Sequence, residues 1–185
     1  RILDGSYHLA ATGRNGKAEY QEAHIPGTIH FDIDAVCDPA PTPSPHMFPS
    51  ADDFSAAVGA MGISNDQRVI VYDADGLFSA PRVWWMFRAF GHENVAVMTG
   101  GFRTWQAEGR PVTADIPSFA AATFSASLDE TKLRSIAQIQ ANIESTEELV
   151  LDARAANRFD GSQPEARAGV EPGHIPGSTN LPYAE

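Results

Sequence analysis

The sequence predicts an α/β fold in which one unit occurs twice, each copy a mainly parallel sheet flanked by helices. The tetrapeptide His-Ile-Pro-Gly occurs at residues 24–27 and again at 174–177. Each is preceded at nearly the same offset by a Leu-Asp pair, at residues 3–4 and 151–152. Landmarks repeated in this way indicate an internal duplication. Short β-branched runs also alternate with helical patterns along the first copy, which is typical of βαβ units.

Two continuous apolar runs in the first copy have the length of strands. They are Arg-Val-Ile-Val-Tyr at residues 68–72 and Asn-Val-Ala-Val-Met at residues 94–98. Strands that are covered by helices on both faces have such continuous apolar sequences. We therefore expect both runs to be central strands of the sheet.

Three helices are predicted around these strands, within residues 50–62, 79–91 and 102–109. In the second of them Ser79 is placed as the N-cap, with Pro81 in the first turn. A glycine ends each of the three patterns, as is common at the C-terminal ends of helices.

The predicted boundary between the copies lies in residues 113–128, which lose the periodicity and are rich in Ala, Ser, Thr and Pro. We interpret residues 1–112 as the first domain, 113–128 as a linker, and 129–185 as the start of the second domain. A helical pattern at 132–143 and a strand ending at Asp152 open the second copy. This second copy is expected to be incomplete, because the chain ends soon after its His-Ile-Pro-Gly.

Composition excludes several classes of partner. The net charge of −11 argues against nucleic acid, since phosphate binding requires clustered Lys and Arg. Cys37 is the only cysteine, which excludes an internal disulfide framework and fits a reducing, cytoplasmic location. No apolar run is long enough to span a bilayer, so no membrane partner is expected.

Four segments, in order along the whole chain, resemble the two-domain rhodanese-family sulfurtransferases. They are residues 18–34, 77–105, 151–169 and 171–182. The resemblance is closest to the mercaptopyruvate sulfurtransferases, with the thiosulfate sulfurtransferases second. It implies tandem rhodanese-like domains, the first catalytically inactive and the second carrying a persulfide-forming cysteine in a loop between a strand and a helix. We expect that nucleophilic cysteine to lie outside this chain.

The corresponding loop of the first copy is predicted to be inactive from its own residues. It follows the strand that ends at Tyr72 and leads into the helix after Ser79. A loop that enters a helix N-terminus presents backbone N–H groups, which lower a thiol pKa and bind anions. Asp73 stands near the place of the thiol, and a carboxylate cannot carry sulfur.

The resemblance also assigns roles to four residues of this chain. Asp34 and His46 match an acid and a histidine that form a proton relay with a serine beyond this chain, a pairing that thiosulfate-preferring relatives commonly lack. Arg158 and Arg167 match the two arginines that hold the carboxylate and keto oxygen of mercaptopyruvate. A carboxylate-oriented imidazole can move a proton near neutral pH, and guanidinium groups bind carboxylates in a bidentate way.

Simpler interpretations of these residues stay open at this point. Arg158 and Arg167 could be surface arginines that pair with neighbours such as Asp160 and Glu165. His46 could be merely exposed, because it follows a proline-rich spacer that makes its reach uncertain.

Other residues that could suggest chemistry are predicted to be structural. Cys37 lies among acids and before no helix, so it is expected to be an unreactive thiol. His24 and His174 begin Pro-Gly turns and are expected to anchor those turns. Neither a metal nor a cofactor is expected.

The function implied for the intact protein is transfer of sulfane sulfur from 3-mercaptopyruvate, through a cysteine persulfide, to a thiol or cyanide acceptor. The expected partners are the small-molecule donor, the missing C-terminal segment, and an acceptor such as a reduced thioredoxin-like protein or a low-molecular-weight thiol. A thiosulfate:cyanide sulfurtransferase and a non-catalytic anion-binding rhodanese module are the alternatives. This chain alone is expected to transfer no sulfur.

Overall fold

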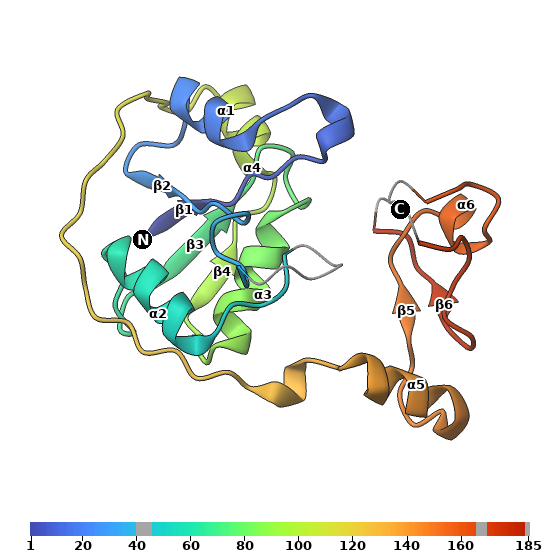
Figure 1. Cartoon of the computed structure of the whole chain (residues 1–185). Coiled ribbons are helices and arrows are strands. Elements are labelled where there is room, and N and C mark those ends of the chain that lie inside the picture. Colours follow the sequence, from blue (N-terminus) through green and yellow to red (C-terminus); the bar gives the residue numbers. More distant parts are fainter. Residues whose placement is uncertain (40–45, 166–169, 184–185) are drawn as a thin grey trace. The chain divides into compact units, whose positions relative to one another are not determined.

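The computed structural model describes residues 1–39, 46–165 and 170–183. They belong to two compact units, Arg1–Lys132 and Leu133–Glu185, which are called unit one and unit two. Each unit is described by itself (Figure 1).

The described part of unit one contains a four-stranded, entirely parallel sheet. The strands are β1 (Ile2–Asp4), β2 (Thr28–His30), β3 (Val69–Tyr72) and β4 (Val95–Val97), arranged in the order β2-β1-β3-β4. The two apolar runs predicted as central strands are thus confirmed as β3 and β4, although β4 forms one end of the described sheet.

Four α-helices cover the two faces of this sheet. They are α1 (Gly16–Glu22), α2 (Ala51–Ala60), α3 (Ala80–Ala89) and α4 (Gly101–Ala107), with a short 3-10 helix, η1, at Ala10–Thr12. Helices α1 and α4 lie on one side of the sheet and α2 and α3 on the other (Figure 1). The three helices predicted from the sequence are confirmed as α2, α3 and α4.

Alternation along the strands divides the side chains between the two faces. Leu3 and Val71 are fully buried in the core that α2 and α3 cover. In that core the ring of Phe54 stacks on Phe90, with 4.3 Å between centroids. On the opposite face Tyr72 stacks with Phe102 of α4 at 6.0 Å.

The segment predicted as a linker is part of unit one, which corrects the predicted domain boundary. Phe124 is only 5% exposed, and its ring centroid lies 6.0 Å from that of Phe54. The Ala122 N–H donates to the Gly59 carbonyl at 2.9 Å, and residue 113 forms an antiparallel bridge with His24. Because these contacts join residues far apart in the sequence, the segment has no local periodicity and yet packs within unit one. Its backbone follows the outer edge of the unit (Figure 1).

Replacing Phe124 by alanine tests this assignment. The change is expected to lower the free energy of unfolding of unit one by about 3 kcal/mol, because it leaves a cavity among aromatic rings. Urea denaturation followed by tryptophan fluorescence would measure it. Ile116→Ala, at a side chain of the same segment that is 61% exposed, is the control and should change stability by less than about 0.5 kcal/mol. A Phe124 variant as stable as that control would contradict the corrected boundary.

Unit two contains α5 (Ile136–Ser145), β5 (Leu151–Asp152), α6 (Ala156–Phe159) and β6 (Thr179–Asn180), with β5 and β6 paired in parallel. Helix α5 starts with a capping box formed by Ser135 and Gln138, which satisfies backbone N–H groups of its first turn. It begins later than the predicted residue 132, because Glu130–Lys132 forms a 3-10 turn that belongs to unit one.

Both His-Ile-Pro-Gly turns have the same local structure. The imidazole of His24 stacks on Tyr20 at 4.1 Å, and its Nδ1 contacts the Tyr20 carbonyl at 2.7 Å. The imidazole of His174 stacks on Phe159 at 3.8 Å, and its Nδ1 contacts the Phe159 carbonyl at 2.8 Å. The strand after each turn pairs with the strand of the preceding Leu-Asp pair in matching register: Leu3↔Ile29, Asp4↔His30, Leu151↔Thr179 and Asp152↔Asn180. The predicted turn-anchoring role of the two histidines is therefore confirmed.

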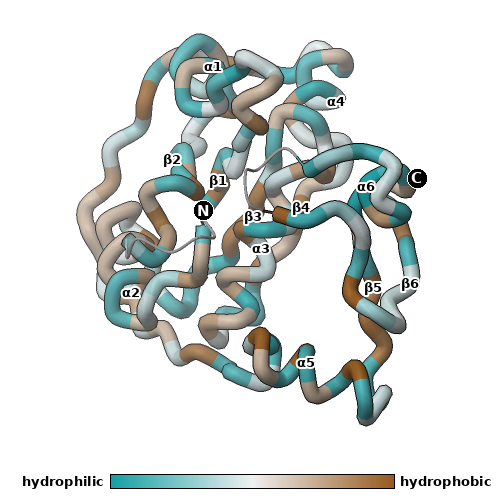
Figure 2. The backbone as a smooth tube through the Cα atoms, turned by 45° about the vertical axis from the view of Figure 1, so that its right-hand side comes forward, coloured by the Kyte–Doolittle hydropathy of each residue, from teal (hydrophilic) through white to brown (hydrophobic). Residues whose placement is uncertain are grey.

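The described part of unit two exposes much of its apolar surface, and none of its large hydrophobic side chains is buried. Figure 2 shows hydrophobic residues along β5 and within α5. The side chains that are at least 40% exposed there are Ile136, Ile143, Leu149, Leu151, Val170, Ile175, Leu181 and Tyr183. Among all described residues of the chain, no helix has the length and apolar character needed to cross a membrane.

Candidate active site

Asp34 and His46 form a direct contact in unit one. The Nε2 atom of His46 lies 2.5 Å from the Asp34 Oδ1 atom. Asp34 lies in the turn that follows β2, and His46 precedes α2. The spacer between them falls largely within residues 40–45, which lie outside the described residues. The side chain of Asp34 is 68% exposed and that of His46 is 22% exposed, so the pair is accessible from solvent.

Neighbouring groups fix the orientation of this pair. The Oδ1 atom of Asp32 accepts the N–H groups of Asp34 and Ala35, at 3.1 and 3.2 Å, which holds the turn that carries Asp34. The Tyr7 ring meets the His46 imidazole edge-on at 5.2 Å. An imidazole held in this way by a carboxylate is suited to accept and return a proton. Which ring nitrogen carries that proton depends on the tautomer.

Arg158 is paired with a carboxylate in unit two. Its Nη2 and Nε atoms donate to Glu165, the latter at 3.3 Å, so the neighbour pairing considered from the sequence is present for Glu165. The Asp160 carboxylate instead accepts the Ser162 N–H at 2.8 Å. The Arg158 side chain is 40% exposed, and its Nη1 atom has no hydrogen-bond partner among the described residues. Arg167 lies outside the described residues.

Arg154 completes this cluster and was not identified from the sequence, whereas Glu165 was considered there only as an ion-pair neighbour of the arginines. Arg154 donates to Glu165 at 2.7 Å and forms two bonds of 3.0 Å from Nε to Asp152. The guanidinium of Arg158 holds the pKa of Glu165 below its usual range, and that of Arg154 does the same for Asp152. Two arginines, Arg154 and Arg158, lie between two acids, Asp152 and Glu165, and this grouping of opposite charges was the available sign of the network. Glu165 binds the Nε and Nη2 atoms of Arg158, and among the described residues Nη1 has no hydrogen-bond partner.

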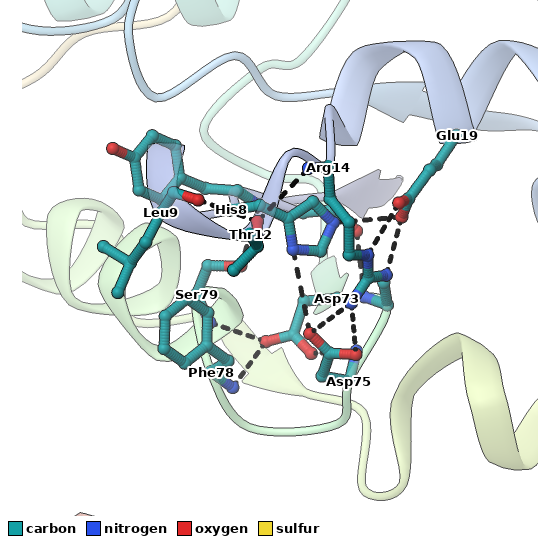
Figure 3. Close-up of polar contacts among 12 residues, drawn as sticks. His8, Leu9, Thr12, Arg14, Glu19, Asp73, Asp75, Phe78 and Ser79 are labelled. Carbon is teal, nitrogen blue, oxygen red and sulfur yellow. Dashed lines mark hydrogen bonds and ion pairs between the residues drawn. The ribbon is translucent and has the colours of Figure 1, made fainter.

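The loop between β3 and α3 encloses the carboxylate of Asp73, which is 1% exposed (Figure 3). Its Oδ1 accepts the N–H groups of residues 75 and 76, at 3.1 and 2.5 Å. Its Oδ2 accepts those of residues 78, 79 and 80, each at 2.8 Å. A ring of backbone amides at a helix N-terminus is an anion-binding arrangement, and here a side chain of the chain itself occupies it.

Asp73 thereby performs the capping that the sequence assigned to Ser79. The Ser79 hydroxyl makes no cap bond to α3 and accepts the Tyr7 N–H at 3.1 Å instead. The residue that the sequence expected in place of a thiol thus fills the ring of amides, and its carboxylate offers no thiol chemistry.

An ion-pair cluster covers the outside of this loop (Figure 3). Arg14 binds Glu19 through Nε at 2.7 Å and Asp75 through Nη1 at 3.0 Å. His8, whose side chain is 3% exposed, contacts Glu19 at 3.0 Å. The Arg14 guanidinium holds the pKa of Glu19 below its usual range. The cluster ties the segment before α1 to the Asp73 loop.

Cys37 lies beside Asp34 in the turn that follows β2. Its Sγ donates to the Asp34 carbonyl at 3.0 Å. Within the part of the chain that the structure describes, no group of three or more His, Cys, Asp or Glu side chains could hold a metal ion.

A parallel sheet covered by helices on both faces, with a ring of backbone amides in the loop that enters α3, defines an α/β domain. The chain belongs to the rhodanese family, because the rhodanese-like domain profile matches residues 14–108.

Sulfurtransferases are similar to this chain over its whole length. The 3-mercaptopyruvate sulfurtransferase of Rattus norvegicus is 46% identical over 187 residues, which cover 100% of this chain and 63% of that protein. The thiosulfate sulfurtransferase of Bos taurus is 46% identical over 186 residues, covering 99% and 62%. The chain thus spans less than two thirds of the length of these relatives.

Solved structures of other proteins are also similar to this chain in fold and in sequence. The 3-mercaptopyruvate sulfotransferase SseA from Escherichia coli has a TM-score of 0.89 and 34% identity, covering 100% of this chain and 69% of that one. The Tum1 protein from Saccharomyces cerevisiae has a TM-score of 0.89 and 29% identity, covering 99% and 63%.

Proposed function

We propose that this chain is part of a sulfurtransferase that takes sulfur from 3-mercaptopyruvate and passes it to a thiol or cyanide. The observation that carries the proposal is the contact of 2.5 Å between His46 and Asp34. Relatives named for mercaptopyruvate and for thiosulfate are equally similar, at 46% identity, so overall similarity does not separate the two donors. The proton-relay pair favours mercaptopyruvate, because its reaction requires a proton on carbon.

The proposed reaction begins at a cysteine thiolate that follows these residues in the longer protein. The thiolate attacks the sulfur of mercaptopyruvate, a sulfur–sulfur bond forms, and the carbon–sulfur bond breaks. The products are a persulfide and the enolate of pyruvate. The proton of the transferred S–H group balances the protonation of the enolate carbon, and we assign its movement to His46, oriented by Asp34. A thiol acceptor then takes the outer sulfur.

Arg158 is proposed to bind the carboxylate of the donor, together with Arg167. Glu165 holds the Arg158 guanidinium from one side, so its orientation is fixed before a ligand arrives. Its Nη1 atom, which has no hydrogen-bond partner among the described residues, is then available for a charge-assisted hydrogen bond to the donor. A bound anion competes little with Glu165, because the two use different edges of the guanidinium.

Intact-mass spectrometry of the full-length protein after exposure to mercaptopyruvate tests the proposed reaction. The expected result is a one-sulfur increment on a cysteine beyond residue 185, with an equivalent amount of pyruvate released. This 185-residue chain, treated in the same way, is the control and should gain no sulfur. A persulfide on Cys37 of this chain, or no increment on the full-length protein, would contradict the proposal.

Arg158→Ala in the full-length protein is expected to raise the KM for mercaptopyruvate roughly tenfold or more, since a charged hydrogen bond contributes about 1.5–3 kcal/mol. Initial rates of pyruvate release measure this change. Arg134→Ala removes another arginine of unit two that pairs with a glutamate, Glu148, and should leave KM unchanged. Equal KM values for the two variants would show that Arg158 does not bind the donor.

A further inference from the structure

Arg82 contacts the segment that carries His46. It lies in the first turn of α3, and its Nη2 atom donates to the His46 carbonyl oxygen. Its guanidinium carbon also lies 4.9 Å from the centroid of the Phe48 ring, within the range of a cation–π contact. One side chain of α3 therefore holds the segment before α2 at two points, residues 46 and 48.

The position of Arg82 is unfavourable for a cation. The N-terminal end of a helix carries partial positive charge, which repels a guanidinium in the first turn. Burial lowers the pKa of Arg82, and its buried Nε atom has no hydrogen-bond partner among the described residues. Arg88 shows the contrast on the same helix: it lies in the last turn, where the dipole favours it, and pairs with Glu93 at 2.6 Å.

The backbone that Arg82 holds is itself strained. His46 has a φ of +62°, and among the described residues only His46 and Thr146 adopt positive φ without being glycine. A positive φ raises the conformational free energy of a non-glycine residue by on the order of 1 kcal/mol, so contacts with surrounding groups must maintain this backbone conformation. The hydrogen bond from Arg82 fixes the carbonyl on one side of His46, and the Tyr7 ring limits the imidazole on the other.

We propose that Arg82 is the positioning residue of the Asp34–His46 pair. By binding the His46 carbonyl it holds the strained backbone in the one conformation that brings Nε2 within 2.5 Å of Asp34. The hydrogen bond between the Arg82 guanidinium and the His46 carbonyl thus stabilises both the unfavourably placed cation and the strained backbone. As a result the His46 imidazole stays oriented toward Asp34. Arg82 acts through His46 and touches no reacting atom. The catalytic consequence of this positioning rests on the proposed function, whereas the positioning itself does not.

NMR spectroscopy of this 185-residue chain tests the positioning without any activity. In the wild type we expect cross-peaks between ring protons of Tyr7 and His46, whose centroids are 5.2 Å apart. Arg82→Met keeps the aliphatic stem but removes the donor, and should abolish these cross-peaks. Those between Phe54 and Phe90, stacked at 4.3 Å, should persist and show that the core is intact. Arg88→Met is the matched control on the same helix and should retain both sets.

Persistence of the Tyr7–His46 cross-peaks in a folded Arg82→Met chain would overturn the proposal. Should the Phe54–Phe90 cross-peaks also disappear, Arg82→Gln replaces the methionine variant, because its polar side chain is easier to accommodate while still too short to reach the carbonyl. The same criterion then applies to it. Arg82→Lys retains a cationic donor and is expected to restore the contact.

Kinetics of the full-length protein give the second test. Arg82→Met is expected to lower kcat for mercaptopyruvate roughly tenfold to a hundredfold, since small displacements of catalytic groups have effects of that size. The KM should change less than about threefold, and Arg82→Lys should recover most of kcat. If the cross-peaks are lost while kcat stays at the wild-type value in both Arg82→Met and His46→Asn, the positioning stands and the proposed function fails.

Discussion

Replacing Asp73 by alanine is expected to lower the free energy of unfolding of unit one by about 5 kcal/mol, enough to unfold many domains of this size. Five backbone N–H groups bind the Asp73 carboxylate, which is almost fully buried. Alanine would leave them without an acceptor, and each buried donor left unsatisfied costs about 1–3 kcal/mol. Water that enters the loop can recover part of this sum, so the expected net loss is smaller than the total.

Asp73→Asn tests whether stability depends on the number of acceptor atoms at position 73 or on the size of the side chain there. Asparagine has nearly the same volume, but one oxygen is replaced by an NH2 group that would face either two or three N–H donors. Asp73→Asn should therefore lose most of the stability that Asp73→Ala loses. Asp75→Asn is the matched control: the Asp75 side chain is 47% exposed and pairs with Arg14, and exposed ion pairs contribute less than about 1 kcal/mol.

Tryptophan fluorescence during urea denaturation measures these changes for unit one alone. All three tryptophans, Trp84, Trp85 and Trp105, belong to unit one. An Asp73→Ala chain that unfolds at the wild-type urea concentration would show that the loop does not depend on its internal carboxylate.

The elements of unit one could be predicted where their sequence signals are local. Residues 69–72 form a strand because four consecutive apolar or β-branched side chains suit a sheet that is buried on both faces. Helix α2 starts where predicted because the Ser50 side chain accepts the Asp53 N–H, a bond within one turn. These signals need no knowledge of the remaining fold.

Contacts between distant residues could not be predicted in this way. The N-cap of α3 comes from Asp73, which lies outside the usual capping position, so a local rule selected Ser79. The sequence of residues 113–128 resembles a linker because isolated side chains such as Phe124 pack into the core of unit one. Such isolated contacts produce no repeating hydrophobic pattern. In each case the sequence contains the residue and only the three-dimensional structure supplies its partner.

The residues of the candidate site show the same difference between those that could be predicted from the sequence and those that could not. Family resemblance identified Asp34 and His46, and the structure brings them together although twelve positions separate them in sequence. No pattern identified Arg82, because its role depends on a hydrogen bond to a backbone carbonyl 36 positions away. Side chains that bind backbone atoms leave little trace in a single sequence, whereas groups that perform chemistry belong to recognisable motifs.

Replacing His46 by asparagine in the full-length protein is expected to lower kcat for mercaptopyruvate roughly a hundredfold or more, because a general acid–base group contributes about 10²–10⁴-fold. The KM should remain close to the wild-type value, since Arg158 and Arg167 are proposed to bind the donor. Rates of pyruvate release at saturating donor measure kcat directly. Met47→Ala changes the adjacent side chain, which is 49% exposed, and is expected to be nearly neutral.

The double variant Asp34→Asn, His46→Asn shows whether the two residues act as one unit. If Asp34 works only by orienting the imidazole, then removing it from a protein that already lacks His46 should cost nothing further, and the double variant should have the kcat of His46→Asn. Multiplying effects would mean that Asp34 acts on the substrate independently, which its 68% exposure permits. The contact of 2.5 Å favours the first result, because a carboxylate in so close a contact with the imidazole has that ring as its principal partner.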